Sequence, residues 1–395
     1  MTTLPLQGTR ILAVGQYGAG PFASMHLADL GAEVIKIEAP GGGDVARATG
    51  PYFLGPDDSA FSQTFNRNKK SLVLDLKSAP GRADFHALVA TADAVLNNLR
   101  GDQPGKLGLT CASLRQIKPN IVCAHLSAYG RDNERAAWPG YDYLMQAEAG
   151  YMHLTGEPGG PPSRMGLSMV DYITGVTLAV GLLAALIGAL KTGQGRDVDV
   201  SLFDVALFQL TYPATWFLNG GHITQRQAQS AHPASVPCQL FSSADGHLFV
   251  MCMTPKFWRM LVDEIDRPAL RDARFASTAL RRDNRAELIP LLDTEFAKRS
   301  TAQWLAALAG KLPISVPWGA SEFHTLNAQK FAERVKAETK KPAHAQPGQA
   351  DHGLDQPPGH DAGAAAQAED CSSIGQQHDR RRAHLGRHRS GAKVP

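Results

Sequence analysis

Apolar runs and amphipathic segments alternate along the first third of the chain. The run at residues 10–14 (RILAV) predicts a buried strand, and residues 33–38 (EVIKIE) predict a second one. Between them, residues 22–30 have the apolar spacing of a helix, which a glycine-rich turn at residues 15–21 joins to the first strand. This β-loop-α-β unit predicts an α/β fold, with a large Rossmann-like domain and a mainly parallel sheet.

Further strands and helices continue the alternation, with polar loops beside the strands. We expect these loops to lie at one edge of the sheet, where open α/β sheets bind ligands. The predicted strands are residues 72–76, 94–96 and 121–126, the helices are 79–90 and 114–117, and the polar loops are 66–71, 97–101 and 127–131.

The longest apolar segment covers residues 173–190. It is only about as long as the shortest membrane span and contains three glycines and two threonines, so a buried core helix is the better interpretation. A strand at residues 198–203 and one apolar helix at 204–218 are expected to follow.

A polar, glutamine-rich linker at residues 220–233 marks a change in pattern. Two apolar runs flank Asp245-Gly246, a dipeptide typical of hairpin turns, and three amphipathic helices follow. These elements predict a smaller α+β domain. The expected divisions are 1–220 for the large domain, 225–317 for the small domain and 318–395 for an atypical tail, which we expect to be disordered because it has few large apolar residues.

Composition narrows the class of protein. The 395 residues are 43% hydrophobic and 19% charged, and the net charge of +3 is too small to indicate a nucleic-acid or membrane partner. The five cysteines form no CxxC pair, which argues against a zinc site or a disulfide framework and suits a reducing compartment. The N-terminus has no signal-peptide pattern, so we expect a cytoplasmic protein. We also expect no bound metal.

Asp171 stands where a glycine- and proline-rich loop meets the long apolar segment. A carboxylate in the first turn of a helix faces the positive end of the helix dipole, which favours its ionised form and suits a nucleophile. Ser168 and Asp171 also have the spacing of a capping box, and the local pattern alone favours a capping role.

The glycine loop after the first strand invites comparison with dinucleotide-binding sites. Its glycines run GxxGxG, however, and Pro21 removes an N–H that would bind pyrophosphate. Glu38 stands where a ribose-binding acid would be expected, so NAD binding stays an alternative, weaker than a simple tight turn. The residues Asn66-Arg67-Asn68-Lys69-Lys70-Ser71 are typical of a solvated turn, or of a phosphate site.

Several short markers, in order, resemble those of the class III CoA-transferases, a family that includes formyl-CoA transferase and α-methylacyl-CoA racemase. The resemblance runs from about Leu6 to Pro317. Its markers are Ala19-Gly20-Pro21, residues 28–38, Gly43-Asp44, residues 66–71, Asn98-Leu99-Arg100, Leu107-Gly108-Leu109, Gly140-Tyr141-Asp142, Asp171, residues 192–195, residues 198–202 and Asp245-Gly246.

The resemblance implies that Asp171 attacks an acyl-CoA thioester and later carries CoA as an aspartyl thioester. Coenzyme A is then a substrate, and no separate cofactor is expected. It also implies an interlocked homodimer. The residues expected to bind CoA are Gln16, Tyr17, Ala19, Arg47, Asn68, Lys69, Lys70, Asn98, Leu99, Arg100 and Tyr141.

Three departures refine the expected activity. Tyr141 replaces the histidine of the racemases, and tyrosine is a poor base at neutral pH, so a transferase is favoured over a racemase. Ala39 replaces an arginine that contacts CoA in many members, and Ala128 replaces a basic residue of formyl-CoA transferase. The pattern is closer to dicarboxylate CoA-transferases that use succinyl-CoA. The alternatives are an acyl-CoA racemase of this family and a non-catalytic acyl-CoA- or NAD-binding protein.

The stretch after Pro317 does not resemble the segment that normally ends these enzymes. Its low-complexity composition is typical of out-of-frame translation. We therefore expect that the native ending of the family is missing from this chain.

Overall fold

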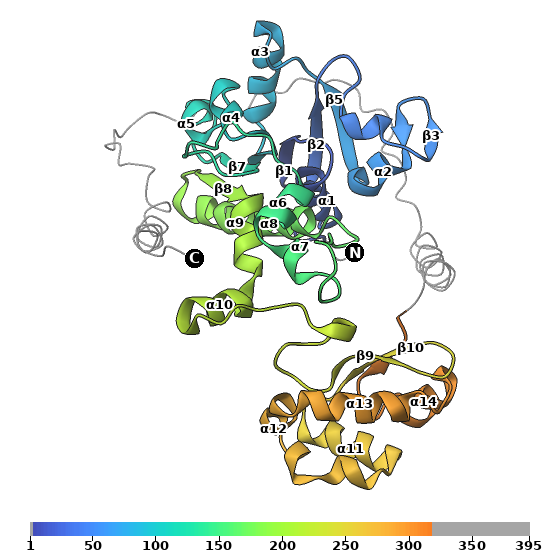
Figure 1. The fold of residues 1–395 in the computed structure, drawn as a ribbon. Helices are drawn as coiled ribbons and strands as arrows, with labels where there is room; N and C mark the ends of the chain where they lie inside the picture. Colours follow the sequence, from blue (N-terminus) through green and yellow to red (C-terminus); the bar gives the residue numbers. More distant parts are fainter. Residues whose placement is uncertain (1–2, 318–395) are drawn as a thin grey trace. The chain divides into compact units, whose positions relative to one another are not determined.

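A six-stranded parallel sheet organises the earlier part of the chain in the computed structural model, which describes residues 3–317 (Figure 1). The spatial order is β5-β2-β1-β6-β7-β8, the order of a doubly wound Rossmann-like sheet. The strand order reverses between β1 and β6, and that point becomes a candidate binding crevice. The strands are β1 Arg10–Val14, β2 Glu33–Glu38, β5 Lys69–Val73, β6 Ala94–Asn97, β7 Val122–Ser127 and β8 Asp197–Ser201.

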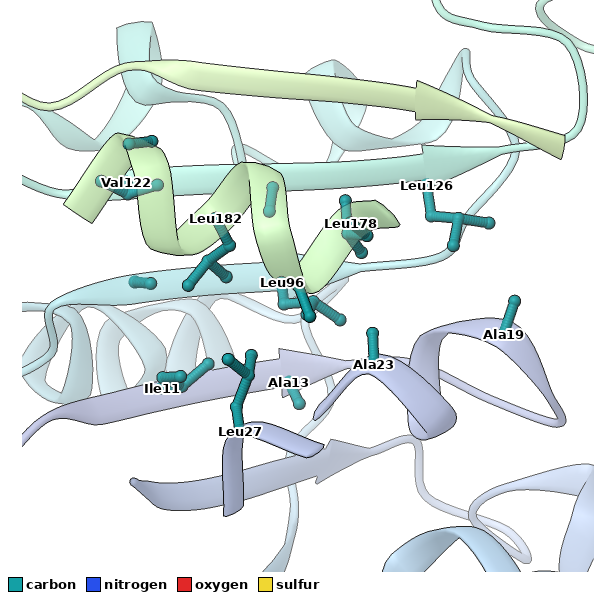
Figure 2. Packing of buried hydrophobic residues seen from close by; sticks show 14 of the residues in the cluster. Ile11, Ala13, Ala19, Ala23, Leu27, Leu96, Val122, Leu126, Leu178 and Leu182 are labelled. Atoms are coloured by element: carbon teal, nitrogen blue, oxygen red, sulfur yellow. The ribbon is translucent and has the colours of Figure 1, made fainter. Parts of the chain in front are cut away.

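Helices cover both faces of the sheet, which explains why its central strands are nearly continuous apolar runs. Along β1, Ile11 and Ala13 pack with α1 (Ala19–Asp29) and α8 (Met169–Thr192), as Figure 2 shows. Leu12 and Val14 belong to a second cluster with Phe85 and Val89 of α3 (Ala79–Val89). The predicted α/β fold with a parallel sheet is confirmed.

Helix α8 is buried on one side only, whereas a buried core helix was expected. Val170, Leu178 and Leu182 are buried, but Val180 is 61% exposed and Leu190 is 82% exposed. This helix is long and apolar enough to cross a membrane by length and composition alone. Helix α8 packs closely on α1, as a helix of a folded domain does. The opposite face of α8 is apolar and exposed.

Several sequence boundaries need correction. The helix expected at residues 114–117 is α5 at Cys111–Leu114, and the strand expected at residues 198–203 is β8, which ends at Ser201. The strand expected at residues 72–76 is β5 at Lys69–Val73, because an edge strand tolerates lysines that reach solvent. The single helix expected at residues 204–218 is two helices, α9 (Leu202–Gln209) and α10 (Thr211–Gly220). The break comes at Thr211, whose φ of 41° is left-handed, and Pro213 follows without an N–H.

A three-stranded antiparallel sheet, in the order β11-β10-β9, organises the later part of the described chain. Phe241 of β9 stacks on Phe296 at a centroid distance of 4.6 Å, in a core shared with Trp304. The hairpin expected around Asp245-Gly246 is confirmed, since Ser243 N donates to Gly246 O at 2.9 Å. The elements are β9 Cys238–Ser242, β10 His247–Met251, α11 Pro255–Ile265, α12 Thr278–Asp283, α13 Arg285–Phe296, α14 Thr301–Leu308 and β11 Ile314–Ser315.

Shorter elements complete the described chain. They are β3 Phe53–Gly55, β4 Asp58–Ser59, α2 Ala60–Asn66, α4 Gln103–Lys106, α5 Cys111–Leu114, α6 Asp142–Glu148, α7 Tyr151–Leu154 and the 3₁₀ turns at Val45–Ala48, Ala228–Ser230, Pro268–Arg271 and Ala273–Phe275. The expected tail at 318–395 lies outside the described residues. The domain boundaries at 220 and 225 stay predictions.

Candidate active site

The loop after β1 is fastened to the end of β6 at the point where the strand order reverses. Asn98 Oδ1 accepts a hydrogen bond from Gln16 N at 2.8 Å, and Asn98 Nδ2 donates to Gln16 O at 2.8 Å. A Cβ at Gly20 would lie 2.7 Å from Asn98 Cγ, so only glycine allows this approach. The structure thus brings the predicted residues Gln16 and Asn98 together.

The Asp171 carboxylate lies directly against this loop. A Cβ built at Gly18 would be 2.6 Å from Asp171 Oδ2 and would therefore collide with it. Gly18 is the N-cap of α1, and Asp171 is in the first turn of α8. The carboxylate therefore faces the positive end of α1 as well as that of its own helix.

Asp142, at the start of α6, holds the N-terminus of α8. Asp171 N donates to Asp142 Oδ2 at 2.9 Å, and Gln146 Nε2 donates to Asp142 Oδ1 at 2.6 Å. Ser168, which was expected to cap α8, makes no side-chain capping bond. The capping interpretation is therefore wrong for the Ser168–Asp171 pair, because a buried carboxylate from another helix supplies the acceptor.

The charge state of Asp171 also differs from expectation. Burial raises its pKa to about 7, and the neighbouring Asp142 carboxylate adds to the increase. Burial and the Asp142 charge thus oppose the ionised form of Asp171, which the helix dipole was expected to favour. A carboxyl group with a pKa near neutrality is typical of functional sites.

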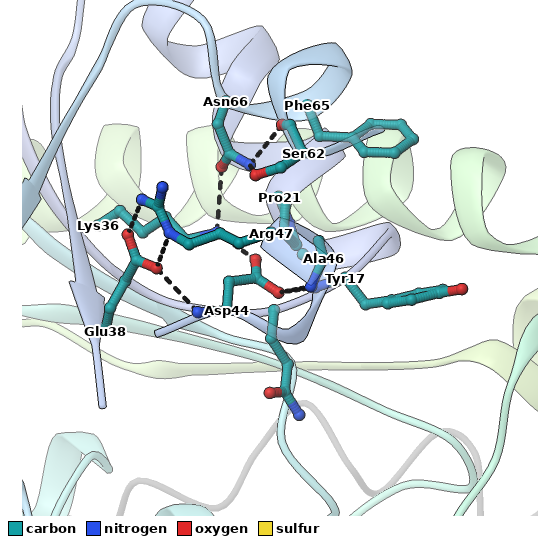
Figure 3. A network of polar contacts seen from close by, with 12 residues as sticks. Tyr17, Pro21, Lys36, Glu38, Asp44, Ala46, Arg47, Ser62, Phe65 and Asn66 are labelled. Atoms are coloured by element: carbon teal, nitrogen blue, oxygen red, sulfur yellow. Dashed lines mark hydrogen bonds and ion pairs between the residues drawn. The ribbon is translucent and has the colours of Figure 1, made fainter. Parts of the chain in front are cut away.

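A buried ion pair beneath the loop fixes the backbone of Tyr17 (Figure 3). Asp44 pairs with Lys36, and its Oδ1 accepts from Tyr17 N at 2.9 Å. Tyr17 has a φ of 66°, which is uncommon outside glycine, so the bond to Asp44 holds a strained turn in place. The sequence marked Asp44 only as part of a motif and gave no sign of this role.

Glu38 is fully engaged by neighbours in the same network. Arg47 binds it through Nε at 2.8 Å and Nη2 at 2.6 Å, Ser71 Oγ donates at 2.6 Å and Asp44 N at 2.9 Å. Burial opposes ionisation, but these bonds prevail and lower the pKa of Glu38 to about 2. Glu38 therefore has no free oxygen for a ribose, which removes the main support for the NAD alternative.

Other residues expected at the CoA site have partners elsewhere. Lys69 Nζ donates to Pro21 O at 2.8 Å and to Phe65 O at 2.7 Å, and burial lowers its pKa to about 6. Lys70 pairs with Glu33, and Asn68 binds Asp29. The expectation that loop 66–71 shares an edge with loops 97–101 and 127–131 is wrong, because it precedes its strand whereas they follow theirs.

Aromatic side chains border the loop that faces Asp171. The rings of Tyr17 and Tyr141 meet edge to face at 6.3 Å, and Phe61 lies 5.1 Å from Tyr17. Tyr141 is 64% exposed, whereas Ala19 is buried. Leu99 packs against the sheet core, and Arg100 pairs with Asp102. The fold thus brings Tyr17 and Tyr141, from distant parts of the chain, together beside the loop that faces Asp171.

Within residues 3–317, no group of three or more His, Cys, Asp or Glu side chains is arranged to hold a metal. Cys123, Cys238 and Cys252 are buried and not joined in disulfides, and Cys111 is also buried. The site instead presents a carboxyl group, backbone at the start of α1 and aromatic side chains. That set is suited to carboxylate chemistry on an activated acyl group.

Comparison with known proteins shows similarity to one family, the CoA-transferases of family III. The model of CoA-transferase family III matches residues 6–350, so the family match extends past Pro317, where the resemblance was expected to end. The chain is 35% identical over 309 residues to the succinate–glutarate CoA-transferase of Agrobacterium fabrum, covering 77% of each protein. It is 35% identical over 316 residues to human succinyl-CoA:glutarate CoA-transferase, covering 80% of this chain and 71% of the human one.

The fold has a solved counterpart. A crystal structure of a CAIB/BAIF family protein from Brucella suis superposes with a TM-score of 0.71 at 31% identity. The superposition covers 84% of this chain and 88% of the Brucella chain.

Proposed function

Because this chain belongs to CoA-transferase family III, we propose that it moves coenzyme A from succinyl-CoA to a second carboxylic acid, with Asp171 as the nucleophile. The chain is a CoA-transferase of the α/β type. The names of its relatives support succinyl-CoA as donor and glutarate as one acceptor. The geometry around Asp171 supports the assignment of the reacting group.

The proposed reaction is a series of acyl exchanges on one carboxylate. Asp171 attacks the thioester carbonyl, which gives a mixed anhydride and releases CoA thiolate. The thiolate attacks the aspartyl carbonyl, which gives an aspartyl-CoA thioester and releases succinate. The acceptor carboxylate then attacks this thioester, which gives a second mixed anhydride and releases CoA thiolate again. The thiolate attacks the acceptor's acyl carbonyl in this anhydride, which gives the new acyl-CoA. Asp171 is regenerated as a carboxylate, so no bond energy is lost to hydrolysis.

One observation carries the assignment: the Asp171 carboxylate lies against Gly18 at the N-terminus of α1. Each attack on a carbonyl develops an oxyanion, and the N–H groups at the start of a helix have no intrahelical partner and can stabilise it. Pro21 supplies no such N–H, so we assign that role to the backbone of residues 18–20. The same loop is held rigidly by Asn98 and Asp44.

The alternative activities receive less support. A racemase needs an acid–base pair, and Tyr141 stands where the family's racemases have histidine. Asp142, the nearest other carboxylate, is occupied by Asp171 N and Gln146. A transferase uses Asp171 as a nucleophile and needs no second base.

We further propose that the active form is a cytoplasmic homodimer. The exposed apolar side chains on α8 and α9, among them Leu190 at 82% and Phe208 at 78% exposed, support burial against a second copy. Cys123, Cys238 and Cys252 are buried and not joined in disulfides, which suits a reducing compartment.

The test is to incubate the protein with succinyl-CoA and glutarate and to measure glutaryl-CoA. Hydroxylamine should convert the activated Asp171 acyl group to a hydroxamate that mass spectrometry locates. Asp171→Ala should abolish both signals. Equal turnover by Asp171→Ala, or no hydroxamate at this position during turnover, would rule the proposal out.

A further inference from the structure

Arg164 lies on the loop that leads to Asp171 and has no carboxylate partner within residues 3–317. Its guanidinium carbon lies 4.6 Å from the centroid of the Tyr143 ring, and Nη1 donates to Met165 O at 3.0 Å and Gly166 O at 3.3 Å. The side chain is exposed. In the described part of the chain its Nε and Nη2 make no hydrogen bond, so one edge of the fork stays available to an anion.

The other cations around the site are already neutralised or saturated. Lys36 pairs with Asp44, Arg47 with Glu38 and Arg100 with Asp102. Lys69 donates to two backbone carbonyls and to Asn66. Among these neighbours, Arg164 alone keeps an unpaired positive charge.

A chain of hydrogen bonds connects the segment of Arg164 to the N-terminus of α8, where Asp171 lies. The next residue donates from Met165 N to Gln146 Oε1 at 2.9 Å, and Gln146 Nε2 donates to Asp142 Oδ1 at 2.6 Å. Asp142 in turn accepts from Asp171 N. The positive charge of Arg164 acts on Asp142 through space and opposes the increase in its pKa caused by burial. The loop position of Arg164 is therefore coupled to that of Asp171.

We propose that Arg164 binds the distal carboxylate of dicarboxylic acyl groups while their other end reacts at Asp171. The inference rests on the proposed function and names the residue that gives it specificity. Tyr143 supports one face of the guanidinium, which leaves its edge to form two parallel hydrogen bonds with a carboxylate. A monocarboxylic acyl group of the same length would leave that cation unpaired and would gain nothing from it.

The test compares acyl groups that differ only in the distal carboxylate. Transfer rates are measured with succinyl-CoA and butyryl-CoA as donors, each with acetate as a common acceptor, and with glutarate and pentanoate as acceptors from one donor. The variants are Arg164→Gln, Arg164→Lys and, as a matched control, Arg115→Gln, which removes an exposed arginine at the end of α5.

Arg164→Gln should lower kcat/KM for succinyl-CoA and glutarate by about 10- to 100-fold and change the butyryl-CoA and pentanoate values by less than about twofold. The kcat/KM of Arg164→Lys should lie between those of the wild type and Arg164→Gln, because lysine keeps the positive charge but cannot form two parallel hydrogen bonds with a carboxylate. Equal losses for both acyl classes, together with weaker binding of free CoA, would assign Arg164 to a CoA phosphate and overturn the inference. Unchanged values for all substrates would also overturn it. If the wild-type protein transfers CoA between none of these acids, the proposed function itself fails.

Discussion

At the scale of single residues, the charge of Asp171 should control activity. Its pKa of about 7 means that the nucleophilic carboxylate is lost as the pH falls through neutrality. We expect kcat/KM to decrease about tenfold per pH unit below about pH 7. A rate profile from pH 5 to 9 measures this. An acid limb near pH 4, the usual range of an aspartate, would contradict the environment described for Asp171.

Asp142→Asn should move that acid limb to lower pH. The substitution removes the negative charge that raises the pKa of Asp171, so the carboxylate ionises more readily. It also weakens the acceptor for Asp171 N and should cost about 1 kcal/mol in the free energy of unfolding, as loss of a helix cap does. Urea denaturation and the pH profile together separate the two effects. An acid limb that stays in place in a folded variant would contradict the coupling.

Gly18→Ala should lower kcat/KM, because the added methyl group collides with the Asp171 carboxylate. Gly18 has a φ of −112° and a ψ of −87°, outside the main regions that alanine adopts, and the added methyl would meet Asp171 Oδ2 at 2.6 Å. Displacing the nucleophile by about 1 Å costs on the order of 100-fold in kcat/KM. Gly105→Ala is the control, because a Cβ there meets nothing within 4 Å. Wild-type rates for Gly18→Ala would contradict the close approach of Asp171 to the loop.

At the scale of elements, one arginine after α10 fastens the segment that leads from α7 towards Asp171. Arg226 donates five hydrogen bonds to backbone carbonyls: Nε to His153 at 2.6 Å, Nη2 to Met152 at 2.8 Å, and Nη1 to Gly160 at 2.7 Å, Pro161 at 3.1 Å and Glu157 at 3.3 Å. A loop with many glycines and prolines has few bonds of its own. Its order therefore depends on this guanidinium.

Arg226→Gln should loosen that loop and expose it to protease. We expect limited trypsin cleavage after Arg164 to speed up by about tenfold, since local opening free energy falls by roughly the worth of one charged hydrogen bond. Arg226→Lys should give a smaller increase, because lysine keeps the charge but has fewer donors. Peptide mapping over time measures the cleavage. If Arg226→Gln leaves it unchanged, the loop is held by other contacts.

At the scale of the whole molecule, the uncovered apolar faces of α8 and α9 should be buried between two copies. Phe208→Asp places a charge on the most exposed part of α9, so it should shift the proposed homodimer towards monomer in sedimentation equilibrium. Leu4→Asp changes a similarly apolar but distant exposed position and is the control. A dimer that survives Phe208→Asp, or a monomeric wild type, would contradict this arrangement.

Local patterns in the sequence predict the mainly parallel sheet and the place of Asp171 at the start of a long apolar helix. The reason is local: the runs at residues 10–14 and 33–38 and the glycine turn between them each have a period that fits one structure. Predicted element boundaries were wrong where contacts with neighbouring elements set the backbone conformation. An example is Thr211, which breaks the helix predicted for residues 204–218. The sequence pattern predicts a loop at the lysines of β5, because only the sheet shows that this strand lies at an edge.

The side chains that lie beside Asp171, and their effect on its pKa, follow from the three-dimensional fold and not from local sequence patterns. Asp142 is 29 residues away in sequence, yet it caps α8 and raises the pKa of Asp171, a role that no local pattern reveals. The sequence pattern suggests that Glu38 and Lys69 bind a ligand. In the fold, however, Glu38 accepts from Arg47 and Lys69 donates to the Pro21 carbonyl. The physical reason is that hydrogen bonding and burial depend on distance in space, whereas a sequence pattern records only spacing along the chain.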